Sequence, residues 1–201
     1  MPPGIPCELI GWDRFRELAR RLALAVRDAG FRPDMIVAIG RGGYLPARIL
    51  SDHLDIFDLA SVKIEHYRGA HRERVARVRY PLNADIGGRR VLLVDDVSDS
   101  GDTFEVAVRH LRECGEPAAL KTAVLHHKTV ASVTPDFYAE AVREWRWIVY
   151  PWAVMEDLRS FLRDMEPPPA STAEFAARLR ERHGIEPDEW ILADVLAQGG
   201  P

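Results

Sequence analysis

The chain is organised around one stretch, VLLVDDVSDSGDT, at residues 91–103. Its four leading apolar residues predict a buried strand. That strand carries two adjacent carboxylates, Asp95 and Asp96, to the carboxyl edge of a sheet, where open α/β folds bind their ligands. The run from Asp99 to Thr103 then predicts the start of a helix, where backbone N–H groups can bind an anion. A strand, an acid pair and an anion-binding turn are therefore expected side by side.

Apolar runs and amphipathic patterns alternate on both sides of this stretch. Strands are expected at residues 35–39, 60–67, 91–94, 118–125 and 137–139, and helices at residues 12–29, 44–54, 103–114 and 154–163. This alternation predicts an α/β fold, with a central, mainly parallel sheet flanked by helices. Residues 68–80 lose the periodicity and contain five arginines, so we expect a mobile basic loop there.

The length and composition fit one such domain with a small appendage. The chain has 201 residues, of which 47% are hydrophobic, enough for one full α/β core. Three consecutive prolines at residues 167–169 predict a stiff linker, because each fixes its own backbone and restricts its predecessor. We therefore expect a main domain at residues 1–166 and a short helical C-terminal extension at residues 167–201.

Charge and cysteine content narrow the class of protein. The formal net charge is -4, which argues against nucleic acid or a membrane surface as a general partner. The two cysteines, Cys7 and Cys114, are too few for a disulfide framework or a thiolate metal site. The start of the chain shows no signal peptide, and no run approaches the roughly 20 apolar residues of a membrane span. We therefore expect a cytoplasmic protein.

The acids and hydroxyls of residues 95–103 suit a phosphorylated sugar. Carboxylates accept hydrogen bonds from vicinal hydroxyls and also ligate Mg²⁺, which prefers oxygen. Gly101 lets backbone N–H groups converge on a phosphate, and Ser100 and Thr103 add hydroxyl donors. The alternative is that Asp99 or Ser100 merely caps the helix, while the acid pair is a solvated strand end.

This segment resembles the 5-phosphoribosyl-1-pyrophosphate signature of the type I phosphoribosyltransferases. The resemblance implies the fold of that family, with a small hood beside the sheet, and a Mg²⁺ cofactor. It implies that Asp95 and Asp96 engage the ribose hydroxyls and Mg²⁺, and that Asp99 lies beside the purine nitrogen as a general base. The implied 5-phosphate site comprises Ser100, Gly101, Asp102 and Thr103, with Asp102 binding through its amide rather than its acidic side chain.

A second glycine-rich turn, Gly40-Arg41-Gly42-Gly43, comes directly after the strand expected at residues 35–39. Taken alone, it could be a plain strand-to-helix turn. The wider segment AIGRGGYLPA, residues 38–47, resembles the pyrophosphate loop of purine phosphoribosyltransferases, which implies that Arg41, Gly42 and Gly43 bind pyrophosphate. In many of those enzymes the loop contains a non-proline cis peptide bond, so we expect one beside Arg41.

The arginine-rich residues 68–80 correspond in position to the flexible lid of the same family. Such a lid excludes water from a ribosyl transition state. Tyr67 and Arg68 are expected to belong to it. The family often has a Ser-Tyr pair here, but His66 replaces the serine, which leaves the details of closure open. A solvated loop without a catalytic part is the alternative.

Lys128 and the segment WIVYPW, residues 147–152, resemble the base pocket of bacterial xanthine-guanine phosphoribosyltransferases and their archaeal relatives. A lysine only donates hydrogen bonds, so it favours a base with a carbonyl oxygen, and an indole offers a stacking surface. The resemblance implies that Lys128 donates to O6, Trp147 stacks on the purine and the backbone of Ile148 contacts the ring edge. The alternative is a surface lysine and core tryptophans; for Trp152 we favour the core.

The resemblance spans about residues 10–155 and implies transfer of a phosphoribosyl group from 5-phosphoribosyl-1-pyrophosphate to guanine, xanthine or hypoxanthine, with the choice among them open. It also implies a homodimer or homotetramer. One alternative is a non-catalytic regulator of the same fold that senses 5-phosphoribosyl-1-pyrophosphate or a nucleotide; the acidic net charge argues against it. Another is a doubly wound phosphoacceptor domain, which leaves residues 99–103 unexplained.

Overall fold

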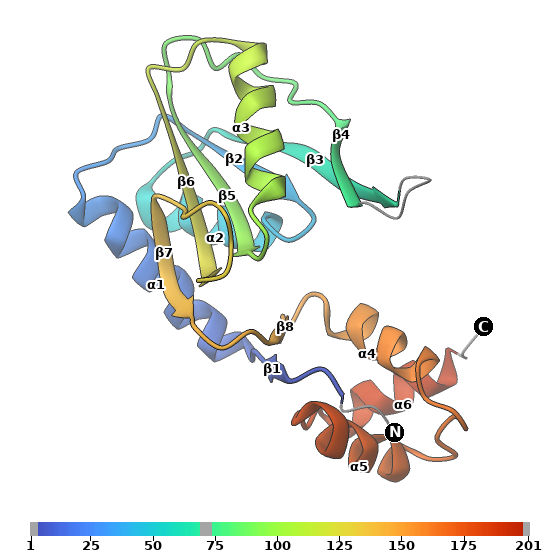
Figure 1. The fold of residues 1–201 in the computed structure, drawn as a ribbon. Helices are drawn as coiled ribbons and strands as arrows, with labels where there is room; N and C mark the ends of the chain where they lie inside the picture. Colours follow the sequence, from blue (N-terminus) through green and yellow to red (C-terminus); the bar gives the residue numbers. More distant parts are fainter. Residues whose placement is uncertain (1–3, 69–73, 199–201) are drawn as a thin grey trace. The chain divides into compact units, whose positions relative to one another are not determined.

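The computed structural model describes residues 4–68 and 74–198 of the chain, which forms two compact units (Figure 1). The sheet unit comprises residues 16–144. The terminal unit combines the residues up to Phe15 with those from Trp145 onward. Each unit has a hydrophobic core. Within the described residues, no helix is both long enough and apolar enough to cross a membrane.

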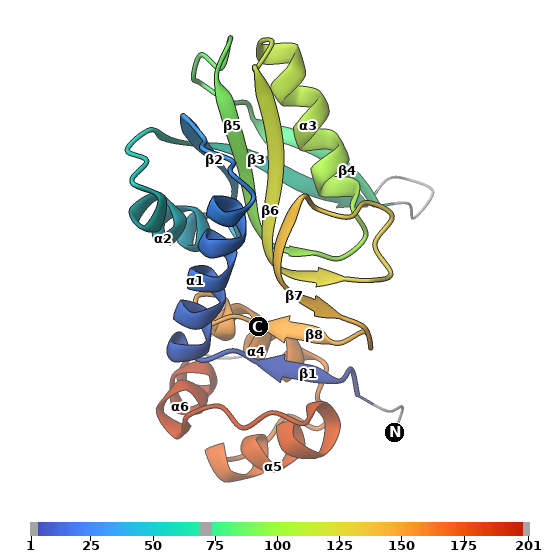
Figure 2. The ribbon, with the colours of Figure 1, turned by 90° about the vertical axis from the view of Figure 1, so that its left-hand side faces the viewer.

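A six-stranded sheet forms the centre of the sheet unit. Its strands lie in the order β4-β3-β2-β5-β6-β7, and all neighbours are parallel except β3 and β4. The strand bounds are β2 Met35–Gly40, β3 Leu59–Arg68, β4 Arg74–Tyr80, β5 Arg90–Ser98, β6 Ala119–Lys128 and β7 Phe137–Val142. The flanking helices are α1 Trp12–Asp28, α2 Tyr44–Leu54 and α3 Asp102–Cys114. Figure 2 shows α1 and α2 on one face and α3 on the other, so the predicted α/β layering is confirmed.

The central strand β5 is buried on both faces of the sheet. Val91, Leu92, Leu93 and Val94 are all 0% exposed. Val91 and Leu93 pack with side chains of α3 in one core cluster, and the residues that alternate with them point to the opposite face. Burying one large aliphatic side chain contributes about 1.5–3 kcal/mol. Strand β5 therefore anchors the unit and fixes the position of the acids at its carboxyl end.

The prediction of a mobile loop over residues 68–80 is wrong for residues 74–80, which form β4 antiparallel to β3. Ala76 and Val78 pack against the core, whereas Arg77 and Arg79 are exposed. Apolar residues that face the core thus alternate with exposed arginines, which is the pattern of a strand. The high arginine content made this alternation hard to recognise in the sequence. Residues 69–73 lie outside the described part of the chain.

Three strands run further than their apolar stretches predict. Strand β5 continues through both acids to Ser98, β6 continues to Lys128, and β7 continues to Val142. The register explains the extension of β5 and β6, because Asp95 lies opposite Val124 and Ser98 opposite His127. The polar residues therefore sit on paired strands rather than on free loops, which gives them fixed positions.

The terminal unit contains a two-stranded parallel sheet and three helices. Strand β1, Cys7–Leu9, pairs with β8, Trp147–Val149. Helices α4 Val154–Arg163, α5 Thr172–His183 and α6 Glu189–Ala197 share one core cluster with β8. Helix α5 is capped by Ser171, whose Oγ accepts the Glu174 N–H at 3.2 Å, and the Glu174 carboxylate accepts the N–H of Ala170, the residue before the N-cap, at 2.8 Å. The predicted helical extension is confirmed, and the domain boundary after residue 166 stays a prediction.

Candidate active site

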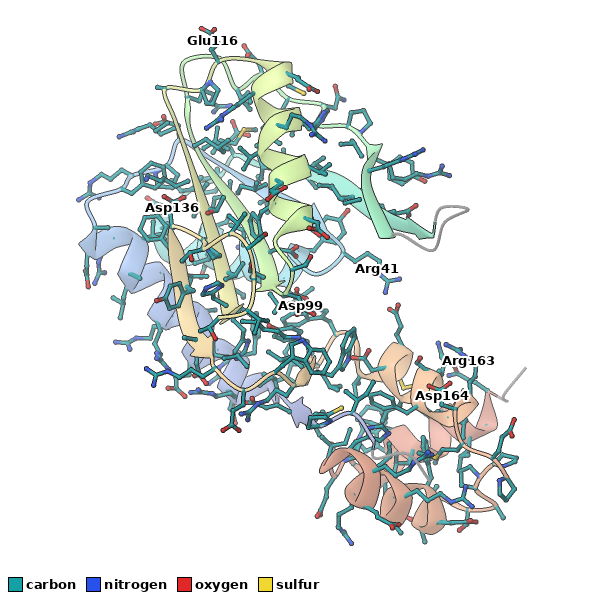
Figure 3. The ribbon with its side chains drawn as sticks, in the orientation of Figure 1. Arg41, Asp99, Glu116, Asp136, Arg163 and Asp164 are labelled. Atoms are coloured by element: carbon teal, nitrogen blue, oxygen red, sulfur yellow. The ribbon has the colours of Figure 1, made fainter. Side chains whose placement is uncertain are left out.

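The carboxyl ends of β2, β5 and β6 carry the side chains singled out in the sequence. The loop after β2, residues 40–43, is called the glycine loop, and the loop after β5, residues 99–103, is called the entry loop because it leads into α3. Both come after neighbouring parallel strands, so they meet at one edge of the sheet. Figure 3 shows Arg41 and Asp99 at this edge.

Asp95 and Asp96 differ in their surroundings because adjacent strand residues point to opposite faces. Asp95 is 8% exposed, and its carboxylate accepts the N–H of Asp96 at 3.0 Å. Burial, and then the charge of Asp96, raises the pKa of Asp95 well above its ordinary value, although hydrogen bonds from the Asp96 and Gly43 N–H groups oppose this. Asp96 is only half-buried, which makes it the more accessible of the two acids.

The glycine loop packs directly against β5. A Cβ on Gly42 would lie closer than 3.0 Å to both carboxylate oxygens of Asp96, and one on Gly43 would come equally close to the Val94 carbonyl oxygen. Gly43 therefore requires glycine because strand backbone occupies the space of a side chain, whereas a side chain at Gly42 would displace the Asp96 carboxylate. The peptide bond between Gly40 and Arg41 is cis, which confirms the expectation from the sequence.

The entry loop presents the N-terminus of α3. The N-cap is Gly101, with a φ of 102°, in the left-handed region that favours glycine. Glycine offers no capping side chain, and the Ser100 Oγ accepts the Asp102 N–H at 3.4 Å, so the alternative in which Ser100 caps the helix stays open for that one N–H group. The first N–H groups of an α-helix lack intrahelical acceptors. Ser100 and Asp102 are exposed, so these groups lie at the surface of the sheet unit.

Lys128 ends β6 and forms an ion pair with Asp99. Its Nζ lies 3.0 Å from Asp99 Oδ2, and the lysine side chain is 3% exposed, compared with 43% for the aspartate. Lys128 is therefore a buried cation, and the alternative of a surface lysine is wrong. Burying an ammonium group costs free energy unless an acceptor is paired with it, so Lys128 requires the Asp99 carboxylate, or an acceptor on a ligand, within hydrogen-bond distance.

Trp147 and Trp152 of the terminal unit have different environments. Trp147 is 39% exposed, and its indole donates a hydrogen bond to Asp157, whose pKa burial raises to about 6. Trp152 stacks on Tyr150, with ring centroids 4.8 Å apart and an interplanar angle of 6°, and meets Phe15 edge-on at 4.9 Å. The expectation that Trp152 is a packed aromatic is confirmed. Trp147 is therefore partly accessible, whereas its neighbour Ile148 is only 7% exposed.

Two of the candidate residues are only partly described. Tyr67 and Arg68 belong to β3, but their side chains lie outside the described part of the structure. In the other direction, sequence reasoning missed Asp157 and also Ser132, which donates to the carbonyl oxygen of Ser100 at 2.8 Å. No sequence signal marks either residue, since an acid in a first helical turn and a serine in a loop are both common.

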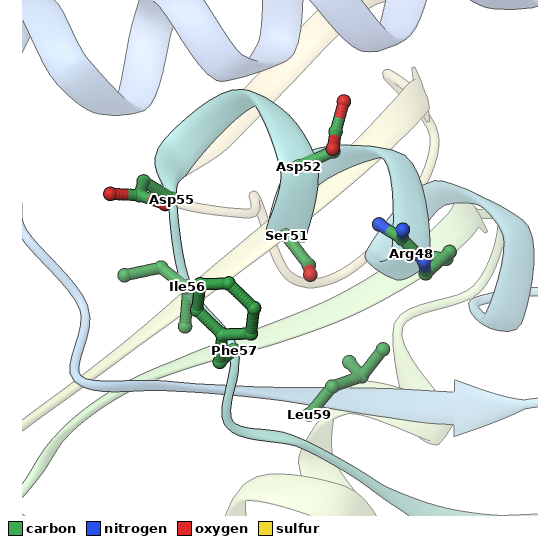
Figure 4. A pocket seen from close by; sticks show the side chains of 7 residues that line it. All are labelled: Arg48, Ser51, Asp52, Asp55, Ile56, Phe57 and Leu59. Atoms are coloured by element: carbon green, nitrogen blue, oxygen red, sulfur yellow. The ribbon is translucent and has the colours of Figure 1, made fainter.

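A pocket of about 270 Å³ lies at the end of α2 and the start of β3, the opposite edge of the sheet from the acids (Figure 4). It is lined by Arg48, Ser51, Asp52, Asp55, Ile56, Phe57 and Leu59. Phe57 is 95% exposed, and the lining carries charges of both signs. Because the pocket lies at the opposite edge of the sheet, none of its lining residues belongs to the glycine loop or the entry loop.

Comparison with known proteins places these features in a family. A model described as phosphoribosyl transferase domain matches residues 11–157. The xanthine-guanine phosphoribosyltransferase of Ruegeria sp. (strain TM1040) is 38% identical over 154 residues, covering 71% of this chain and 83% of the relative. The enzyme of the same name from Cereibacter sphaeroides (strain ATCC 17025 / ATH 2.4.3) is 33% identical over 149 residues, covering 71% and 84%.

The fold is also similar to those of solved structures. A purine phosphoribosyltransferase from Pyrococcus horikoshii Ot3 superposes with a TM-score of 0.65 at 33% identity, covering 74% of this chain and 94% of that one. A hypothetical protein from Neisseria gonorrhoeae with bound ppGpp gives a TM-score of 0.64 at 29% identity, covering 74% and 89%. Helices α5 and α6 lie beyond residue 157, where the family match ends.

Proposed function

Because the chain belongs to the purine branch of the phosphoribosyltransferase family, we propose that it transfers the 5-phosphoribosyl group of 5-phosphoribosyl-1-pyrophosphate to a 6-oxopurine in purine salvage. The products are the purine nucleotide and pyrophosphate. The observation that carries this proposal is the buried Lys128 paired with Asp99, directly before the N-terminus of α3. Lys128, the donor for the base, then lies against Asp99 at the start of the entry loop, and the backbone N–H groups that bind the phosphate follow in the same loop.

The 5-phosphate binds at the N-terminus of α3 in this proposal. The backbone N–H groups of Ser100, Gly101, Asp102 and Thr103 surround it, and the hydroxyls of Ser100 and Thr103 donate further hydrogen bonds. The exposure of Asp102 supports a role for its amide, because the carboxylate can turn into solvent, away from the anion.

The ribose hydroxyls and Mg²⁺ engage Asp95 and Asp96. Each acid offers carboxylate oxygens, which fit this hard cation, and because the two side chains point to opposite faces they would divide these roles rather than form one donor set. The close approach of Asp96 to Gly42 puts the Asp96 oxygens beside the glycine loop. When bound, the ion neutralises charge on the departing pyrophosphate. Arg41, which Figure 3 shows at the same edge, adds a second positive charge there, with Gly42 and Gly43 supplying close backbone approach.

The base is recognised through Lys128 and Asp99. Lys128 donates to O6, and Asp99 accepts the proton that the attacking purine nitrogen loses as its bond to C1′ forms and the bond from C1′ to pyrophosphate breaks. Trp147 stacks on the ring and the backbone of Ile148 contacts its edge, which the exposed indole supports. Tyr67 and Arg68 belong to a lid that excludes water during transfer.

We further propose a homodimer or homotetramer, with the surface around Phe57 in an interface between copies. The support is a phenyl ring that is 95% exposed beside a hollow lined by Arg48, Asp52 and Asp55, because in a two-fold dimer each copy presents the same surface to the other. Light scattering of the parent and of Phe57→Ser tests this: the variant should shift to a smaller species, and an unchanged mass excludes this surface.

The test of the main proposal is pyrophosphate release with Mg²⁺, 5-phosphoribosyl-1-pyrophosphate and each of guanine, xanthine, hypoxanthine and adenine. Release is expected with at least one 6-oxopurine, and at a much lower rate with adenine, because the amino group of adenine meets the donor Lys128. Binding of 5-phosphoribosyl-1-pyrophosphate without turnover of any base would instead support the non-catalytic sensor. Preference for adenine would exclude the assignment of Lys128.

A further inference from the structure

Ser132 lies on the loop between β6 and β7 and donates two hydrogen bonds to the backbone of the entry loop. Its N–H lies 2.9 Å and its Oγ 2.8 Å from the carbonyl oxygen of Ser100. Ser132 Oγ also occupies the space beside Gly101, where a Cβ would lie only 2.6 Å from it. Hydrogen bonds and packing therefore both join Ser132 to the peptide between Ser100 and Gly101.

A fixed carbonyl also fixes the N–H of the same peptide. The peptide group is planar and trans, so its C=O and N–H point in opposite directions. With the Ser100 carbonyl directed at Ser132, the Gly101 N–H is directed away from Ser132. That N–H belongs to the N-cap of α3, where backbone donors lack intrahelical acceptors. Gly101 has the most backbone freedom of any residue type, so an external constraint matters most here.

The loop that carries Ser132 is itself anchored at both ends. At its start, the Ala131 N–H donates to the Lys128 carbonyl oxygen at 2.9 Å. At its end, Asp136 accepts the Thr122 N–H at 2.8 Å and pairs with Lys121 at 2.7 Å, and these bonds lower the pKa of Asp136 although burial opposes them. Both ends of the loop that carries Ser132 are therefore bonded to residues of strand β6, which restricts the position of Ser132.

We propose that Ser132 is a positioning residue for the 5-phosphate of the substrate: it orients the Gly101 N–H toward the anion through the Ser100 carbonyl. The inference rests on the proposed function and extends it to a residue that does not itself touch the substrate. A preoriented donor binds an anion more tightly than one that must be ordered on binding, because the ordering entropy has already been lost.

The test is Ser132→Ala, which removes the hydroxyl and keeps the backbone N–H of the loop. Because Ser132 is exposed and one of its two bonds survives, the expected rise in KM for 5-phosphoribosyl-1-pyrophosphate is about 3- to 10-fold, the range for loss of one ordinary hydrogen bond. The KM for the purine and the melting temperature should stay unchanged. Ser132→Thr, which keeps a hydroxyl, should restore the parent value, and Thr134→Ala serves as the control in the same exposed loop.

Calorimetric binding of a purine nucleoside 5′-monophosphate and of its nucleoside separates this inference from the proposed function. Ser132→Ala should weaken the nucleotide by the same factor and leave the nucleoside unchanged. If the parent turns over a 6-oxopurine but Ser132→Ala binds the nucleotide like the parent, or loses both ligands equally, Ser132 has no positioning role. If the parent itself neither turns over a base nor binds 5-phosphoribosyl-1-pyrophosphate, the proposed function fails instead.

Discussion

Replacement of Lys128 by methionine tests the base site most directly. Methionine keeps an unbranched side chain of similar length, so it can fill the buried space of a residue that is 3% exposed while removing only the charge and the donors. A hydrogen bond involving a charged group contributes about 1.5–3 kcal/mol, which corresponds to roughly 10- to 150-fold in kcat/KM. We expect a loss of this size for every 6-oxopurine that the parent uses.

The assay is pyrophosphate release. The purine concentration is first varied at saturating 5-phosphoribosyl-1-pyrophosphate, and the concentration of 5-phosphoribosyl-1-pyrophosphate is then varied at saturating purine. The KM for 5-phosphoribosyl-1-pyrophosphate should change by less than about 3-fold, because the proposed phosphate site consists of backbone groups of the entry loop. Lys121→Met is the matched control. Lys121 lies on the same strand and also pairs with an aspartate, Asp136, at 2.7 Å, but its side chain is 44% exposed. Its loss should leave kcat/KM for the purine within about 2-fold at saturating 5-phosphoribosyl-1-pyrophosphate, because Asp136 keeps its hydrogen bond from Thr122.

Two results would refute this reasoning. If Lys128→Met keeps its kcat/KM for 6-oxopurines within about 3-fold, Lys128 does not contact the base. If the variant loses affinity for 5-phosphoribosyl-1-pyrophosphate as strongly as for the purine, the ion pair with Asp99 supports the whole entry loop instead. The double variant with Asp99→Asn decides between a shared and a separate role, because the effects of residues in one ion pair are not additive.

Three further predictions concern single residues. Asp99→Asn should lower kcat by about 10²–10⁴-fold with little change in the KM for 5-phosphoribosyl-1-pyrophosphate; steady-state kinetics showing parent activity would reject its role as base. Gly42→Ala should abolish turnover, because its Cβ would meet the Asp96 carboxylate, and an active variant would show that the glycine loop can move aside. Burial raises the pKa of Asp157 from 3.8 to about 6, so the folded parent loses stability as pH rises through this window. Asp157→Asn removes that loss, by about 1 kcal/mol after solvent screening; its melting temperature should exceed that of the parent at pH 7 but not at pH 4, and a pH-independent difference would contradict this.

The sequence predicted the layers of the fold because its strongest signals are local. The apolar run at residues 91–94 and the glycine turns at residues 40–43 and 101 each restrict the backbone over a few residues. It did not predict β4, since the inward Ala76 and Val78 alternate with arginines that dominate the composition. Only pairing with β3, which is not local, makes that alternation a strand.

The candidate site shows the same division between local and non-local information. That Lys128 is buried could not be read from its sequence, because a lysine at a strand end is usually solvated. Its burial depends on the extension of β6 beside β5 and on a carboxylate from the entry loop. The glycines of residues 42 and 43 were recognised by type, but the reason for them, contact with β5, required the structure.

The ends of β5 and β6 are joined twice, and this has a consequence for substrate selection. One link is the ion pair of Asp99 with Lys128, and the other is the pair of hydrogen bonds from Ser132 to Ser100. Asp99 and Ser100 are consecutive, with Cα atoms about 3.8 Å apart, so the proposed proton acceptor for the base and the peptide next to the proposed phosphate site belong to one short segment. In the proposed function, a ligand that fills both subsites carries its base and its 5-phosphate on one ribose. Loss of the Ser132 link should therefore reduce discrimination between a nucleotide and a nucleoside, because it weakens the phosphate subsite alone, whereas loss of the Lys128 link should weaken the binding of both ligands.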